Sequence, residues 1–197
     1  MMRKLLDIGI EQMKKMIGEM ADGSLEALGS ARKSLEGEFN STGEIASKLH
    51  ILRLGILDLV TELLIRYSPV AGDLRYIQSA IDVSYDLYRI SRYAMEIERT
   101  VKIVMAPVEI SLEAFPLTEE AVKISVEAFS ELDETLVGRL IEIDRQIDRY
   151  YLDSLMALRD NPKKAVDALI MRHLERICDH ANEIGARVVY IREGKRW

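Results

Sequence analysis

Two pairs of acidic residues in the C-terminal third of the chain have the spacing of a cation site. Glu175 and Asp179 stand four residues apart in HLERICDHANEI (173–184), and Asp144 and Asp148 have the same spacing in EIDRQID. Side chains four residues apart lie on one helix face, about 6 Å from each other, so like charges there repel unless a cation lies between them. Carboxylate oxygens suit hard cations such as magnesium, calcium, manganese and iron, and they also bind zinc.

The two pairs are predicted to face each other across a helical hairpin. The DNPKK stretch (160–164) breaks the chain between them, and a short turn there makes the flanking helices antiparallel neighbours. Asp148 then lies as far from the turn as Glu175 does. Asp144 likewise lies as far from it as Asp179. We therefore expect the four carboxylates at one level of the hairpin, as the candidate metal site.

A solvated surface is the competing interpretation of the same acids. The apolar stripe of the helix puts Glu175 and Asp179 toward its outer face, so a site there would be a surface groove and not a buried pocket. Arg172 and Arg176 stand three residues before these two acids and can pair with them. Spacing alone leaves the two interpretations open.

The remaining reactive side chains of this stretch point to no catalytic centre. His173 and His180 are candidate additional ligands, although histidines on solvated faces are common, and Cys178 is expected to be a small helix-packing residue. A carboxylate-bridged metal enzyme of the ferritin type is the enzymatic alternative. Such sites use Glu-x-x-His, and no histidine of this chain has a glutamate three residues before it. We predict no enzyme, no catalytic residue and no organic cofactor.

The elements that must position these residues are helices. Apolar residues recur every three or four positions along almost the whole chain, which predicts six amphipathic helices and an all-α fold. Residues 1–106 are expected to form one three-helix bundle and residues 118–197 a second, joined by a linker over 107–117 that contains Pro107 and Pro116. Thr118 is the expected start of the fourth helix.

The two halves are predicted to be copies of one unit. DLYRISRYAMEIE (86–98) aligns with HLERICDHANEIG (173–185) at a constant offset of 87 residues, and the two share a Leu-x-Arg-Ile core. Chance similarity between two amphipathic helices is the alternative. With the repeat, the fold becomes a pair of pseudo-repeated three-helix bundles.

Composition excludes several other classes of protein. The chain has 197 residues and a net charge of −6, which argues against a nucleic-acid-binding surface. A single cysteine makes no internal disulfide. No apolar run approaches the roughly 20 residues of a membrane span, and the N-terminal residues have no signal-peptide pattern. We expect a cytoplasmic protein.

Two motifs resemble the PhoU family of phosphate-uptake regulators. LERICDHANEI (174–184) is similar to that family's LERIGDxAxNI signature, and SPVAGDLRYI (68–77) is similar to its P-x-x-x-DLR-x-I segment. The length and the six-helix plan also match. The resemblance implies a cytosolic regulator that binds the ATPase subunit of the Pst phosphate ABC transporter, with a linked sensor kinase where one exists, and that contacts the membrane only through the transporter. A homodimer and a helical adaptor for another partner stay open.

The resemblance also implies a metal, iron or zinc, on paired acidic motifs of the bundle surface. Glu175 with Asp179 matches one such motif, and Asp144 with Asp148 matches another. The first half departs from the pattern. The repeat offset and reflection about Pro69 place four residues without a carboxylate at the equivalent positions: Ala46, His50, Tyr88 and Arg92. We therefore expect at most the second half to bind metal.

Overall fold

The computed structural model describes residues 2–195, and this part of the chain is built from six long α-helices. They are α1 (Met2–Ser34), α2 (Thr42–Tyr67), α3 (Ala71–Val104), α4 (Ile110–Glu131), α5 (Val137–Asp160) and α6 (Ala165–Glu193). Two single-turn 3₁₀ helices, η1 (Glu134–Leu136) and η2 (Pro162–Lys164), lead into α5 and α6. The predicted all-α class with six helices is confirmed.

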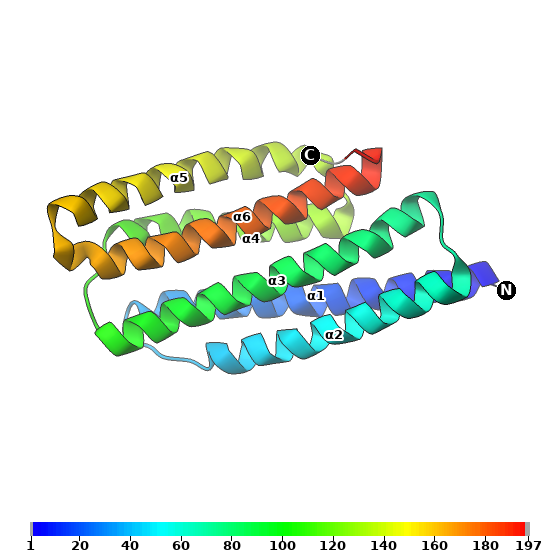
Figure 1. The fold of residues 1–197 in the computed structure, drawn as a ribbon, viewed down its shortest axis with the longest axis horizontal. Helices are drawn as coiled ribbons and strands as arrows, with labels where there is room; N and C mark the ends of the chain where they lie inside the picture. The colour runs from blue at the N-terminus through cyan, green and yellow to red at the C-terminus, as the bar shows by residue number, and fades with distance from the viewer. Residues whose placement is uncertain (1, 196–197) are drawn as a thin grey trace.

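The helices form two bundles of three that lie side by side. α1, α2 and α3 pack together, as do α4, α5 and α6, and the bundles meet where α3 packs on α6 and α1 on α4 (Figure 1). α2 and α5 lie at the two outer edges. The α3–α6 contact runs through the middle of the molecule. A site along this contact therefore takes side chains from both bundles.

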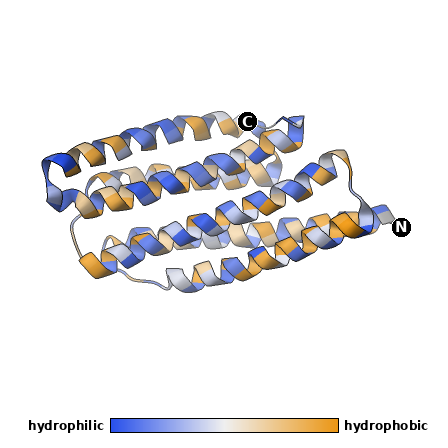
Figure 2. Cartoon of the chain, in the orientation of Figure 1, coloured by the Kyte–Doolittle hydropathy of each residue, from blue (hydrophilic) through white to orange (hydrophobic). Residues whose placement is uncertain are grey.

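Each helix buries one apolar stripe, as the sequence period requires. Figure 2 shows apolar and polar residues alternating around every helix. In the core, Leu87 and Ile90 of α3 and Leu174 and Ile177 of α6 are almost fully buried. Burying each such side chain contributes about 1.5–3 kcal/mol. No helix among residues 2–195 is long and apolar enough to cross a membrane.

The fourth helix begins earlier than predicted, so residues 110–117 are not linker. α4 starts at Ile110, Pro116 lies inside it, and the connection from α3 is reduced to residues 105–109. Thr118, the expected start, is buried in the helix and donates its hydroxyl hydrogen to the Ala114 carbonyl at 3.3 Å. A proline inside a helix usually weakens it, so something must hold this first turn in place.

A carboxylate from α6 holds the start of α4. Buried Asp167 accepts hydrogen bonds from the backbone N–H groups of residues 109, 110 and 111 at 2.9–3.1 Å, and from the Ser111 hydroxyl at 2.6 Å. These are the N–H groups that a helix start leaves without partners. Because Asp167 is more than fifty residues away in sequence, no local capping rule finds it.

Candidate functional site

The structure places the four predicted acids on the facing sides of α5 and α6. Asp144, Glu175 and Asp179 are half-buried and Asp148 is exposed. Partial burial raises the pKa of Asp144, and the negative charges of Asp148 and Asp179 raise it further. Burial also raises the pKa of Glu175, with added repulsion from Asp179 and Asp148. The acids of one helix thus act electrostatically on those of the other.

Two of the four acids have arginine partners on their own helix. Arg172 donates to Glu175 at 2.5 Å, and Arg176 forms an ion pair with Asp179. The side chain of Glu175 keeps only 12% of its surface exposed. Among residues 2–195, neither Asp144 nor Asp148 forms an ion pair. The negative charge that remains unbalanced is therefore on the α5 side of the hairpin.

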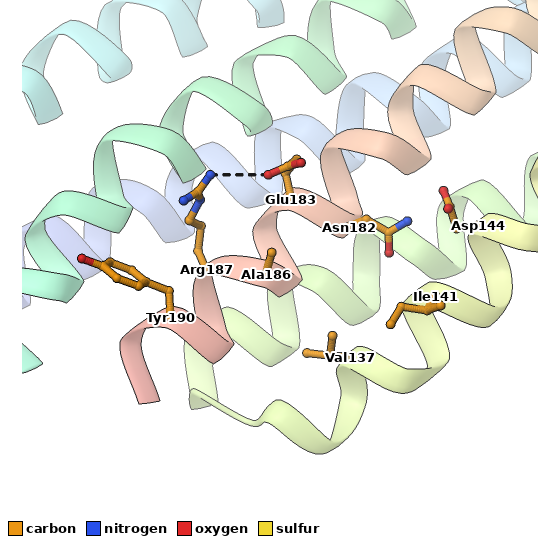
Figure 3. A pocket seen from close by; sticks show the side chains of 8 residues that line it. All are labelled: Val137, Ile141, Asp144, Asn182, Glu183, Ala186, Arg187 and Tyr190. Atoms are coloured by element: carbon orange, nitrogen blue, oxygen red, sulfur yellow. Dashed lines mark hydrogen bonds and ion pairs between the residues drawn. The ribbon is translucent and has the colours of Figure 1, made fainter. Parts of the chain in front are cut away.

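A surface groove runs past Asp144. Its volume is about 520 Å³, and Val137, Ile141, Asp144, Asn182, Glu183, Ala186, Arg187 and Tyr190 line it (Figure 3). A second groove of about 560 Å³, between α3 and α6, also includes Asp144, together with Asp179 and His180. Asp144 therefore lines both grooves and is open to a solute from either one.

The four acids have suitable donor chemistry for a hard cation but do not form a ready-made cage. Within the described part of the chain, no three His, Cys, Asp or Glu side chains are already arranged to hold a metal ion. Arg172 and Arg176 lie on the acids of α6. A cation that used all four carboxylates would need these long, partly exposed side chains to turn away.

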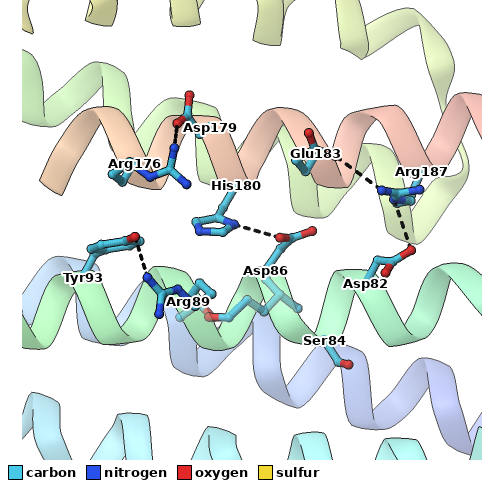
Figure 4. Close-up of polar contacts among 12 residues, drawn as sticks. Asp82, Ser84, Asp86, Arg89, Tyr93, Arg176, Asp179, His180, Glu183 and Arg187 are labelled. Carbon is cyan, nitrogen blue, oxygen red and sulfur yellow. Dashed lines mark hydrogen bonds and ion pairs between the residues drawn. The ribbon is translucent and has the colours of Figure 1, made fainter. Parts of the chain in front are cut away.

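His180 does not lie on the solvated face where the sequence suggested it. It is buried on the side of α6 that faces α3, and its Nδ1 lies 2.8 Å from Asp86 Oδ1 (Figure 4). Burial raises the pKa of Asp86, while the hydrogen bond and charge of His180 oppose that rise, as does the charge of Arg187. Glu183 adds a further repulsion. His180 thus joins the two bundles through Asp86, and it lines the α3–α6 groove together with Asp144 and Asp179.

The other two side chains of the opening stretch have packing roles. The His173 ring lies 5.8 Å from the Tyr93 ring of α3, and burial lowers its pKa. Cys178 is buried, its Sγ lies 3.8 Å from the Thr118 hydroxyl, and burial raises its pKa. The expected packing role of Cys178 is confirmed. Sequence reasoning missed Asp86, although an acid directly beside core residue Leu87 was a signal for a buried polar partner.

The equivalent positions of the first half have no carboxylate. The His50 and Tyr88 rings lie 5.3 Å apart, which is the register that reflection about the α2–α3 turn predicted. Ala46 is buried, and Arg92 lies 3.8 Å from Glu96. His50, Tyr88 and Arg92 thus stand where α5 and α6 have acids, and Ala46 is part of the core.

Comparison with known proteins identifies the family. The model of the PhoU domain matches residues 10–101 and 112–188. A relative from Thermotoga maritima, described as phosphate-specific transport system accessory protein PhoU homolog 1, is 27% identical over 97% of this chain and 87% of its own length. The Archaeoglobus fulgidus relative is 28% identical over 95% of this chain and 96% of its own length. The Synechocystis relative is 32% identical, and the match spans 63% of its length.

Solved structures show the same fold. The crystal structure of PhoU from Pseudomonas aeruginosa superposes with a TM-score of 0.77 at 22% identity, over 98% of both chains. The phosphate transport system regulatory protein PhoU from Streptococcus pneumoniae gives a TM-score of 0.74 at 21% identity, over 98% of this chain and 99% of its own. With the family model matched along both bundles, the chain belongs to the PhoU domain family.

Proposed function

We propose that this chain regulates phosphate uptake by binding the phosphate ABC transporter on its cytoplasmic side. One observation carries the proposal. The similarity to relatives described as accessory proteins of the phosphate-specific transport system extends over 97% of the chain in the Thermotoga relative. The contact would be with the ATPase subunit, and with a linked sensor kinase in cells that have one. The membrane is then reached only through the transporter.

Exposed apolar side chains support a role in binding another protein. Ile65 on α2 is 77% exposed, and Ile103 at the end of α3 and Met105 just after it are 70% and 79% exposed. Single exposed apolar side chains such as Ile65 are common on any folded chain, whereas neighbouring ones, such as Ile103 and Met105, are typical of surfaces that dock a partner. They support equally a helical adaptor for a different partner, which the experiment below distinguishes.

The proposed function includes a metal site on the second bundle. Asp144, Asp148, Glu175 and Asp179 would hold iron or zinc through their carboxylate oxygens, with Arg172 and Arg176 turned away. The repulsion among the four acids supports this assignment, because a cation would relieve it. A bound ion would supply positive charge and a bridge between α5 and α6. Elemental analysis of the purified chain beside the Glu175→Ala/Asp179→Ala variant tests it, and equal, near-zero metal in both contradicts it.

A binding experiment tests the regulatory role. The purified chain is immobilised and exposed to the isolated ATPase subunit of the phosphate transporter from the same organism. We expect saturable binding. The ATPase subunit of an unrelated importer serves as the matched control and should not bind. No binding to the phosphate transporter subunit, or equal binding to both, contradicts the proposal, and capture of a different defined partner favours the adaptor.

A further inference from the structure

Arg89 of α3 is a half-buried cation, and in the described residues no carboxylate forms an ion pair with it. Its Nη2 donates a hydrogen bond to the Tyr93 hydroxyl at 2.5 Å, and its Cζ lies 4.7 Å from the centre of the Tyr93 ring. Its Nε is buried and has no hydrogen-bond partner. A guanidinium withdrawn from water in this way lacks the anion it usually accompanies.

A second arginine reaches the same phenol from the other bundle. Arg176 of α6 lies near the Tyr93 hydroxyl, close enough for Tyr93 to raise the pKa of Arg176. Burial opposes ionisation of Tyr93, but the hydrogen bonds and charges of Arg176 and Arg89 lower its pKa overall. Figure 4 shows the three side chains at the line where α3 and α6 meet. Two positive charges from different bundles therefore converge on one neutral oxygen.

The local charge balance favours an anion at this point. Arg176 forms an ion pair with Asp179 and is also attracted by Glu175, whereas Arg89 forms no ion pair in the described residues. The guanidinium group presents a planar fork of N–H donors that fits the oxygens of phosphate or sulfate two at a time. An oxyanion beside Tyr93 would accept from both arginines and separate their charges.

Arg89 and Tyr93 keep part of their surface exposed, and Arg176 lines a neighbouring groove. The groove of about 560 Å³ between α3 and α6 is lined by Arg176, His180 and Tyr85 among others. Five acids and two arginines line this groove: Arg187 pairs with both Asp82 and Glu183, Arg176 pairs with Asp179, and Asp86 hydrogen-bonds to His180. Asp144, without such a partner in the described residues, belongs to α5 and lines the same groove. The excess positive charge is therefore confined to the surroundings of Arg89 and Tyr93.

We propose that Arg89 and Arg176 bind a small tetrahedral oxyanion, of the class of inorganic phosphate and sulfate, at the contact between the two bundles. Tyr93 positions both guanidinium groups. Because one arginine comes from each bundle, the bound anion holds α3 against α6. The site requires no contact with a transporter, and it shares Arg176 with the metal site, where that arginine pairs with Asp179.

Titration of the full chain with inorganic phosphate, and separately with sulfate, tests this site. Calorimetry at constant ionic strength in chloride should show saturable binding, with one anion per chain. Arg89→Gln should weaken binding at least tenfold. Arg159→Gln is the matched control, because Arg159 is exposed and, within residues 2–195, pairs only with the adjacent Asp160. The affinity of this variant for the anion should equal that of the unaltered chain. Competition between phosphate and sulfate then shows whether the site prefers one oxyanion.

Two further measurements separate binding from folding. Bound anion should shift the ionisation of Tyr93 to higher pH, because it offsets the two guanidinium charges, and this shift should vanish in Arg89→Gln. If circular dichroism shows that Arg89→Gln does not fold, the binding measurement is made on Arg89→Lys instead. That variant keeps the positive charge and loses the planar set of guanidinium N–H donors. Absence of saturable binding of either anion, equal affinity in the Arg89 variant, or binding of a phosphorylated peptide without binding of free phosphate overturns the proposal.

Discussion

Asp144 carries a negative charge that no basic side chain balances in the described part of the molecule. Its raised pKa means that the folded chain disfavours the carboxylate relative to the unfolded chain. The free energy of unfolding of the metal-free protein should therefore fall as pH rises from the ordinary aspartate range through the raised pKa. Asp144→Asn removes this cost. Since the residue is only half-buried, we expect a gain of about 0.5 kcal/mol at pH 7.

Urea unfolding in the presence of a chelator measures this effect. The gain of Asp144→Asn over the unaltered chain should shrink toward zero near about pH 3, below the ordinary aspartate pKa. Asp153→Asn, at an exposed position of the same helix, should have no effect. With metal added, the sign should reverse, because the amide that replaces the carboxylate is a weaker ligand. Destabilisation by Asp144→Asn in chelator would contradict the repulsion between the acids.

The charge of Asp167 stabilises the start of α4. Burial alone would raise its pKa, but hydrogen bonds from Ser111 and from the backbone of residues 109–111 lower it overall. Its contribution to stability is therefore present above the ordinary aspartate pKa and is lost as pH falls through the lowered value. Asp167→Ala should cost about 1–3 kcal/mol at pH 7, because it leaves buried N–H groups without partners.

Hydrogen exchange locates that loss. The amides of residues 109–114 should exchange faster in Asp167→Ala, while those of α1 stay protected. Asp133→Ala, which removes an exposed local cap on Thr135, is the matched control and should cost less. Unchanged exchange at the start of α4 would show that Pro116 and its neighbours hold that turn without Asp167.

At the scale of elements, the contact between α3 and α6 contains a buried acid–base pair. His180→Ala would leave the Asp86 carboxylate buried without its partner. We expect a loss of about 3 kcal/mol or more at pH 7. The loss should be smaller near about pH 4, because removing His180 raises the pKa of Asp86 further and the neutral acid is tolerated. Glu183 repels the Asp86 carboxylate and Arg187 attracts it, and both have a smaller effect on the pKa of Asp86 than burial and His180 do.

A double-mutant cycle checks this prediction by chemical denaturation. The Asp86→Ala/His180→Ala variant should be more stable than the sum of the two single losses implies, because neither partner is left alone. Additive losses would mean that the pair is not coupled across the contact. Circular dichroism should show that the helices remain in all three variants.

Helix positions were predictable wherever the chain itself carries the signal. The breaks near Pro69 and Pro162 were found because proline ends or begins helices by local geometry. The start of α4 was not found because it depends on Asp167, a distant residue. The N–H of Thr42 at the start of α2 likewise points to a distant acid, Glu98, at 3.3 Å.

For the whole molecule, the register within each hairpin followed from the sequence, but the contact between the bundles did not. Counting from the turns placed His50 beside Tyr88 and the acids of α5 beside those of α6. The inward turn of His180 depends on how one bundle is rotated against the other, which no single helix encodes. At an offset of 87 residues, Asp86 corresponds to His173 and Tyr93 corresponds to His180. A two-fold relation between the bundles would therefore exchange the Asp86–His180 contact with the Tyr93–His173 contact, and both contacts are observed.

Phosphate uptake tests the proposed regulatory role most directly. Uptake of labelled phosphate is measured in cells that lack this chain, in cells with the chain restored, and in cells that also lack the phosphate transporter. Loss of the chain should change the uptake rate in phosphate-rich medium, and restoring the chain should reverse the change. In cells without the transporter, neither loss nor restoration of the chain should change the uptake rate. Unaltered uptake after loss of the chain, or an equal change without the transporter, would contradict the proposed role.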